Sequence, residues 1–170
     1  MKTTTNEKAE RKQKAEAAAL ARIPAMDDAD GLRILMGNAK DQQSTIVFNA
    51  AFRRLMDVLP GEAPGTVDHD FWRSTFVYEE LLSEKNGKKT LASRIRQKVK
   101  RLGVSKTIED LASAKSESDG FKMLIQRGMP ELTAEAVVVR HADRFSPAVV
   151  EAARSRLAAA EAAVQDQQAH

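Results

Sequence analysis

A block of basic residues with no acid among them is the part of this sequence whose chemistry is easiest to name. Between Lys85 and Lys106, a stretch of 22 residues, the chain contains nine bases and neither Asp nor Glu. Such a block suits phosphate groups, because each phosphate that it neutralises releases counterions. Together with the neighbouring Thr107, these bases form the predicted nucleic-acid site: Lys85, Lys88, Lys89, Arg94, Arg96, Lys98, Lys100, Arg101, Lys106 and Thr107.

The net charge of the whole chain hides this block. The 170 residues include 27 Lys and Arg against 24 Asp and Glu, a formal charge of +3. Outside the basic block, 18 bases face all 24 acids, so the rest of the chain carries −6. Local potential, rather than the sum, decides which partners are attracted. The sequence therefore predicts a mildly acidic protein with one cationic surface.

A helix is predicted over residues 90–102, with Thr90 as its N-cap and Gly103 just beyond its end. At about 100° per residue, its apolar side chains form one narrow stripe and its bases fall on two flanks. Two flanks of bases can reach both walls of a nucleic-acid groove. The preceding loop, Lys85–Thr90, adds three lysines and backbone amides at a helix start, a combination that favours anions.

The segment Leu102-Gly103-Val104-Ser105-Lys106-Thr107 resembles the turn of the helix-turn-helix motif of bacterial repressors. Gly103 stands where such a turn needs a left-handed residue, and Ser105 can cap the next helix. The sequence departs from that pattern at Glu109, where the motif usually buries an aliphatic residue. Acids in the second helix repel phosphate, so the helix before the turn is expected to make the contacts. A plain corner between two helices is the alternative.

The sequence offers no strong catalytic or metal-binding pattern, and we expect no enzyme activity, metal or cofactor. Cysteine is absent, and neither His69 nor His141 has a second ligand at helical metal spacing. The triplet Asp68-His69-Asp70 fits a helix start, where acids suit the helix dipole. His141 fits a hydrogen-bonded position at a helix end. Glu79 and Glu80 are consecutive, so their side chains diverge and do not share a proton.

Apolar periodicity predicts an all-α fold, a compact bundle of about seven to eight short-to-medium helices. Helices are predicted over residues 30–36, 44–59, 68–85 and 90–102, and four further helices begin at Ser105, at Ser118 or Asp119, at Thr133 and at Ser146. Three valines, Val137–Val139, are the one strand-like run, but no second such run exists to pair with it. The expected organisation is a flexible charged arm over residues 1–26, a single domain over 27–165 and a disordered tail over 166–170.

The leading hypothesis is a non-enzymatic DNA-binding protein of regulatory or accessory type, with transcription regulation as the obvious role. Double-stranded DNA is favoured, and RNA stays open because a basic helix does not distinguish the two. The competing hypothesis is a helical interaction module whose basic face binds an acidic protein. A homodimer is compatible with either reading.

No apolar run reaches membrane-spanning length, so we expect no membrane association. The first residues are too charged for a secretion signal, and we expect a cytoplasmic location.

Overall fold

The structure, a computed structural model, describes residues 2–168, and every regular element in that range is helical. Nine α-helices and three short 3-10 turns are present there, without a strand, which confirms the all-α class. Eight of the nine correspond to the predicted helices, and the ninth, α1 (Lys2–Arg22), occupies the expected arm. The chain divides into two compact units, residues 1–61 and residues 62–170.

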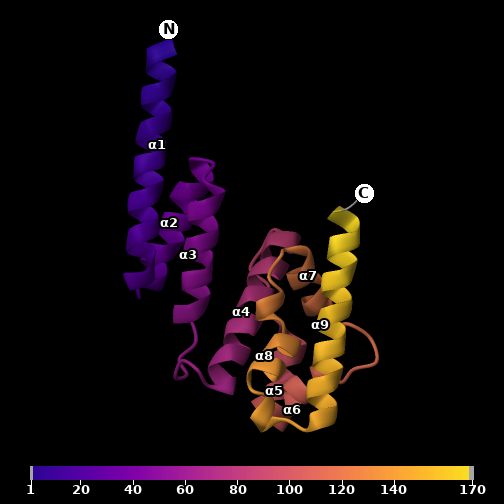
Figure 1. Cartoon of the computed structure of the whole chain (residues 1–170). Helices are drawn as coiled ribbons and strands as arrows, with labels where there is room; N and C mark the ends of the chain where they lie inside the picture. The colour runs from indigo at the N-terminus through magenta and orange to yellow at the C-terminus, as the bar shows by residue number, and fades with distance from the viewer. Residues whose placement is uncertain (1, 169–170) are drawn as a thin grey trace. The chain divides into compact units, whose positions relative to one another are not determined.

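The first unit consists of α1, α2 (Ala29–Asp41) and α3 (Thr45–Val58). Helices α2 and α3 pack as a hairpin, and α1 lies beside α3 (Figure 1). The Asp28 carboxylate caps α2 by accepting the amides of Asp30 and Gly31. Its core is built from apolar side chains that are at most 6% exposed: Ile23, Leu32, Val47, Ala51, Phe52, Leu55 and Met56.

One helix of this unit is longer than the sequence predicted, and the expected arm contains a helix. The predicted helix 30–36 continues through Gly37 to Asp41, because a mid-helix glycine costs only about 1 kcal/mol and Ala39 is buried beyond it. The expected arm is helical over Lys2–Arg22, and Ile23, just after it, is 3% exposed. The Arg54 Nε also donates to the Met26 carbonyl oxygen at 2.7 Å, which ties this junction to α3.

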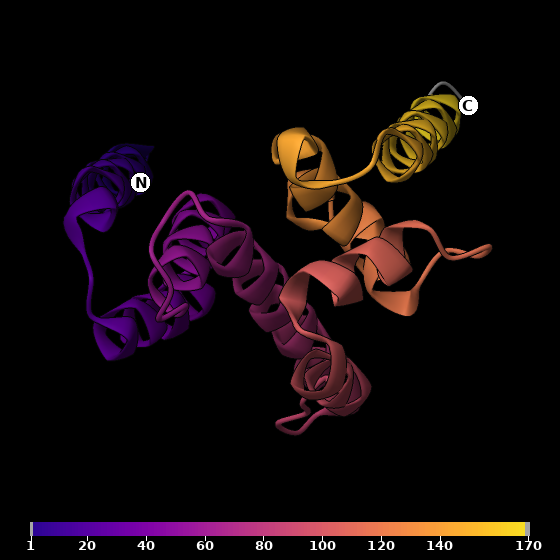
Figure 2. The same ribbon diagram turned by 90° about the horizontal axis from the view of Figure 1, so that it is seen from below.

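The second unit contains α4 (Val67–Asn86), α5 (Ser93–Leu102), α6 (Val104–Ala112), α7 (Asp119–Gln126), α8 (Ala134–Arg140) and α9 (Pro147–Gln168). Figure 2 shows α8 leading through a turn into the long α9, and the two helices pack along each other. The run of three valines is helical within α8, as predicted. The main apolar cluster joins α4, α6, α8 and α9 and includes Phe71, Ile108, Val137, Val138 and Val150.

Several predicted helix starts of this unit are confirmed and others are shifted. The hydroxyls of Ser118 and Thr133 accept amides of α7 and α8, each at 3.1 Å, and α9 begins at Pro147 after Ser146. Helix α4, however, is capped by Thr66 rather than by Asp68. Of the expected tail, residues 166–168 continue α9, and residues 169–170 lie outside the described residues.

Helix α5 begins at Ser93, three residues later than the predicted cap at Thr90. The Thr90 amide donates to the Ser83 Oγ at 2.8 Å, and the Ala92 amide donates to the Glu79 Oε1 at 2.9 Å. These side-chain acceptors hold residues 90–92 along α4 in a non-helical path. Helix α6 begins at Val104, so Ser105 lies within its first turn and does not cap it.

A buried ion pair ties α9 to α8 and to the end of α6. Glu135 is 1% exposed, and the Arg156 Nη1 donates to its Oε1 at 2.8 Å. The same guanidinium donates to the carbonyl oxygens of Leu111 and Ala114. Burial raises the pKa of Glu135, and the hydrogen bond from Arg156 only partly opposes that rise. The carboxylate therefore depends on Arg156 to stay charged inside the unit.

We expect Arg156→Met to lower the free energy of unfolding by about 3 kcal/mol near pH 7, because it leaves the Glu135 carboxylate buried and unpaired. The loss should be smaller at pH 5, because a raised pKa favours the neutral form of this carboxyl group as the pH falls. Urea unfolding at both pH values measures this, with the exposed Arg154→Met on the same helix as control. An equal loss at both pH values would contradict the explanation.

Candidate functional site

The predicted basic site lies around α5, but the structure separates its members into two groups. Three of its nine bases form ion pairs within the second unit. Arg96 pairs with Glu79, Lys98 with Asp110, and Lys106 with both Glu109 and Asp110. These three side chains have an intramolecular partner, and their contribution to any external anion site is reduced accordingly.

Arg96 is the most firmly held of the three. Its Nε and Nη2 donate to the two carboxylate oxygens of Glu79 at 2.6 and 2.7 Å. Its guanidinium also lies over the rings of Trp72 and Phe76, with centroid distances of 5.3 and 5.7 Å. The hydrogen bonds to Glu79 raise the pKa of Arg96. These hydrogen bonds and ring contacts attach α5 to α4, so Arg96 holds α5 in place on the second unit.

The two acids in the last turn of α6, Glu109 and Asp110, both form ion pairs with lysines. The Lys98 Nζ lies 2.8 Å from the Asp110 Oδ2, and this hydrogen bond, followed by that from Lys106, lowers the pKa of Asp110. Thr107, which the sequence placed in the site, is fully buried, and its hydroxyl donates to the Gly103 carbonyl oxygen at 2.8 Å. Thr107 therefore serves the α5–α6 junction and offers no surface to a partner.

The remaining six bases form what we call the cationic face. All six are exposed, and within residues 2–168 the structure gives them no ion pair: Lys85, Lys88, Lys89, Arg94, Lys100 and Arg101. The nearest acid before them, Glu84, is held by the Arg127 Nη2 at 3.1 Å. Three of the six lie on one exposed arc of α5, which they share with Ser93 and Gln97. These six side chains therefore carry positive charge that no acid of the described residues neutralises.

The junction that resembles a helix-turn-helix motif is a one-residue corner. Only Gly103 separates α5 from α6, whereas the motif joins its helices through about three or four residues. Gly103 has φ +80°, a backbone conformation that residues with a side chain rarely adopt, so the corner itself requires glycine at this position. With Glu109 and Asp110 engaged by lysines, the geometry fits the alternative of a helix corner.

We expect Arg96→Gln to lower the free energy of unfolding by about 2 kcal/mol, because it leaves the Glu79 carboxylate, 7% exposed, without its charged partner. Arg101→Gln removes the same charge from the exposed arc of the same helix and should change stability by less than about 0.5 kcal/mol. Thermal and urea unfolding monitored by circular dichroism compares the two. Equal losses would show that Arg96 does not hold α5.

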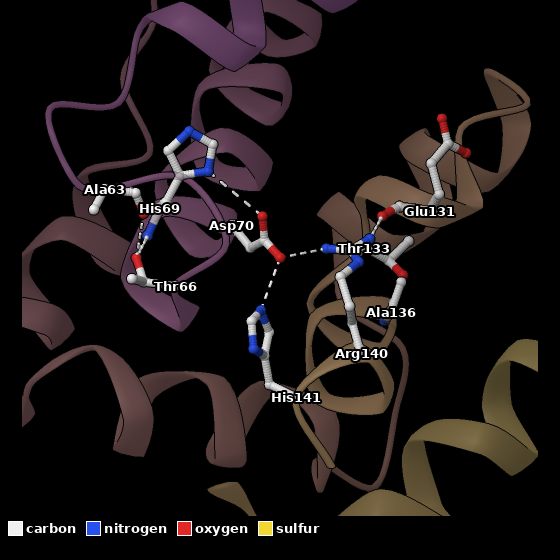
Figure 3. Close-up of polar contacts among 9 residues, drawn as sticks. All are labelled: Ala63, Thr66, His69, Asp70, Glu131, Thr133, Ala136, Arg140 and His141. Carbon is white, nitrogen blue, oxygen red and sulfur yellow. Dashed lines mark hydrogen bonds and ion pairs between the residues drawn. The ribbon is translucent and has the colours of Figure 1, made fainter. Parts of the chain in front are cut away.

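A second polar cluster gathers around the buried carboxylate of Asp70, near the start of α4 (Figure 3). The Asp70 Oδ2 accepts from the Arg140 Nη1 at 2.7 Å and lies 2.8 Å from the His141 Nε2. The His69 Nδ1 lies 3.5 Å from the other oxygen. Burial raises the pKa of Asp70, but the hydrogen bonds from Arg140 and His141 outweigh it, so the net pKa is lowered.

This cluster connects helices rather than exposing reactive groups. Arg140 also donates to the Glu131 carbonyl oxygen at 2.8 Å, so Asp70 ties the start of α4 to the end of α8 (Figure 3). Among the described residues, no group of three or more His, Cys, Asp or Glu could hold a metal ion. Sequence reasoning recognised Asp70 and His141 separately as polar residues at helix ends. Nothing local in the sequence indicated that they meet, because the two residues are 71 positions apart.

We expect Asp70→Asn to lower the free energy of unfolding by about 2 kcal/mol near neutral pH, since two charge-assisted contacts are weakened. A lowered pKa means that the carboxylate stabilises the fold above its unfolded pKa of about 3.9, and that this contribution is lost as the pH falls through the folded pKa. The wild type and variant should therefore converge below about pH 4. Acid titration of both proteins, followed by circular dichroism, measures it, and a gap that persists in acid would refute it.

Over the described part of the chain, no helix combines the length and apolar character that crossing a bilayer requires.

No protein family, curated protein or solved structure matches this chain. The function must therefore be argued from the chain's own surface.

Proposed function

We propose that this chain is a non-enzymatic nucleic-acid-binding protein that holds the phosphates of double-stranded DNA on its cationic face. The observation that carries the proposal is the set of six exposed bases without an ion pair in the described residues, next to three bases that the fold has neutralised. Placing like charges together is unfavourable in the absence of an anion. A bound polyanion such as DNA would supply the negative charge that balances these six bases.

The geometry of the face suits a phosphate backbone. Arg94 and Arg101 are seven positions apart on one side of α5, a separation of about 10 Å along the helix axis. On one strand, successive phosphates rise by about 3.4 Å, so the two guanidiniums span several of them. Lys100 on α5, and Lys88 and Lys89 in the loop before it, are exposed as well and add positive charge. Ser93 and Gln97, on the same arc, are neutral hydrogen-bonding groups.

The salt dependence of binding tests this proposal. We expect the logarithm of the binding constant for a labelled duplex to fall steeply with the logarithm of salt concentration, with a slope of about −5 if all six bases contact phosphates. Arg94→Gln with Arg101→Gln should reduce the magnitude of that slope by about two. Fluorescence anisotropy across a sodium chloride series measures both quantities.

The matched control removes the same net charge elsewhere in the second unit. Arg144 and Arg154 are exposed and lie outside the cationic face, so Arg144→Gln with Arg154→Gln should leave the slope unchanged. A slope near zero, or equal effects of the two double variants, would overturn the proposal. Tighter binding to RNA at the same salt slope would reassign the partner to RNA, and equal affinity for polyglutamate would reassign it to an acidic protein.

A further inference from the structure

A cavity of about 420 Å³ opens beside the start of α5. Its wall is made mainly by α4, by the first turn of α5 with the segment before it, and by α7, and Leu111 of α6 and Ala134 of α8 complete it. Much of that wall is apolar, with Phe71 and Leu82 from α4 and Phe121 and Leu124 from α7. Small-molecule sites commonly enclose about 300–1,000 Å³ and are lined in this way. The cavity therefore has the size and surface of a ligand site.

Leu91 lies in the wall of the cavity and is 48% exposed. An exposed leucine beside an apolar hollow leaves apolar surface in contact with water, at about 25 cal/mol per Å². An apolar molecule inside the cavity would cover part of the Leu91 side chain and would contact the lining residues Phe71 and Phe121. The hydrophobic contribution thus favours a ligand with a ring-sized apolar body.

The charged side chains of the wall are Arg94 and Asp119. Asp119 lies in the first turn of α7, where the helix dipole offsets a negative charge. It also acts on Tyr78, whose pKa is raised by burial first and by the Asp119 charge second. Arg94 has no ion pair in the described residues. The positive charge is therefore the less compensated of the two.

We propose that this cavity binds a small amphipathic anion, whose apolar body packs between α4 and α7 and whose carboxylate or sulfonate group pairs with Arg94. A planar guanidinium can bind such a group through two parallel hydrogen bonds. The site goes beyond the proposed function, and its test uses no nucleic acid, so either proposal can fail without the other.

Two fluorescent probes with the same rings separate the charge from the apolar contribution. Anilinonaphthalene sulfonate carries an anionic group, and phenylnaphthylamine is its uncharged counterpart. We expect the wild type to bind the sulfonate about tenfold more tightly than the neutral probe, the effect of one charge-assisted contact. Titration of each probe, followed by its emission, gives the two dissociation constants.

Three variants locate the site. Arg94→Gln should bring the ratio of the two constants to about one, whereas Lys122→Gln, an exposed base on α7 outside the cavity, should leave it unchanged. Ser74→Phe places a ring into the cavity from α4 and should weaken both probes by at least about tenfold. Circular dichroism checks that each variant keeps its helix content.

The opposite results are equally clear. If the neutral probe binds as tightly as the sulfonate in the wild type, Asp119 cancels Arg94 and the anion preference is wrong. If Arg94→Gln and Lys122→Gln lower sulfonate binding alike, the probe responds to net charge and not to this cavity. These two exposed positions decide the matter even if Ser74→Phe loses helix content.

Discussion

The buried carboxylate of Glu79 is the constraint on which the basic part of this protein depends. It accepts hydrogen bonds from the Ala92 amide and from the Arg96 Nε and Nη2. A single side chain of α4 therefore fixes the residue at which α5 begins and the face of α5 that packs against α4. An ionised group in such a place is stable only when its partners are complete. Once Arg96 is turned inward, helical geometry places Arg94 and Arg101 on the opposite side of α5. Lys100, one turn after Arg96, is also exposed.

The second unit thus contains two groups of basic residues, those that pair with acids inside the unit and those of the cationic face. Arg96, Lys98 and Arg156 are held by acids and attach one helix to another. The cationic face takes no part in this internal pairing. Arg94 belongs to that face and also lines the cavity beside α5, so the two proposed sites share one side chain. If both proposals hold, Arg94 cannot pair with a small anion in the cavity and with a DNA phosphate at the same time.

Sequence reasoning predicted the features that depend on neighbours along the chain. Helical periodicity identified eight of the nine described helices, and local chemistry identified the caps at Ser118 and Thr133. It failed where a distant group competes with a local signal. Thr90 resembles a cap, yet its amide is taken by Ser83, and Arg96 looks like a surface base, yet Glu79 holds it from 17 positions away. The Asp70 cluster and the cavity also require the packed helices, so no spacing in the sequence could reveal them.

Helix α5 buries none of its own side chains completely, which sets it apart from the helices that build the core. It is attached through Arg96, which pairs with Glu79 and stacks on Trp72 and Phe76, and through the pair of Lys98 with Asp110. The corner at Gly103 and partial contacts of Ile95 and Val99 with the main cluster complete the attachment. Segments with few buried apolar contacts open locally at a lower free energy than the whole fold. We therefore expect α5, with Arg94, Lys100 and Arg101, to open locally at a lower free energy than the core of the second unit.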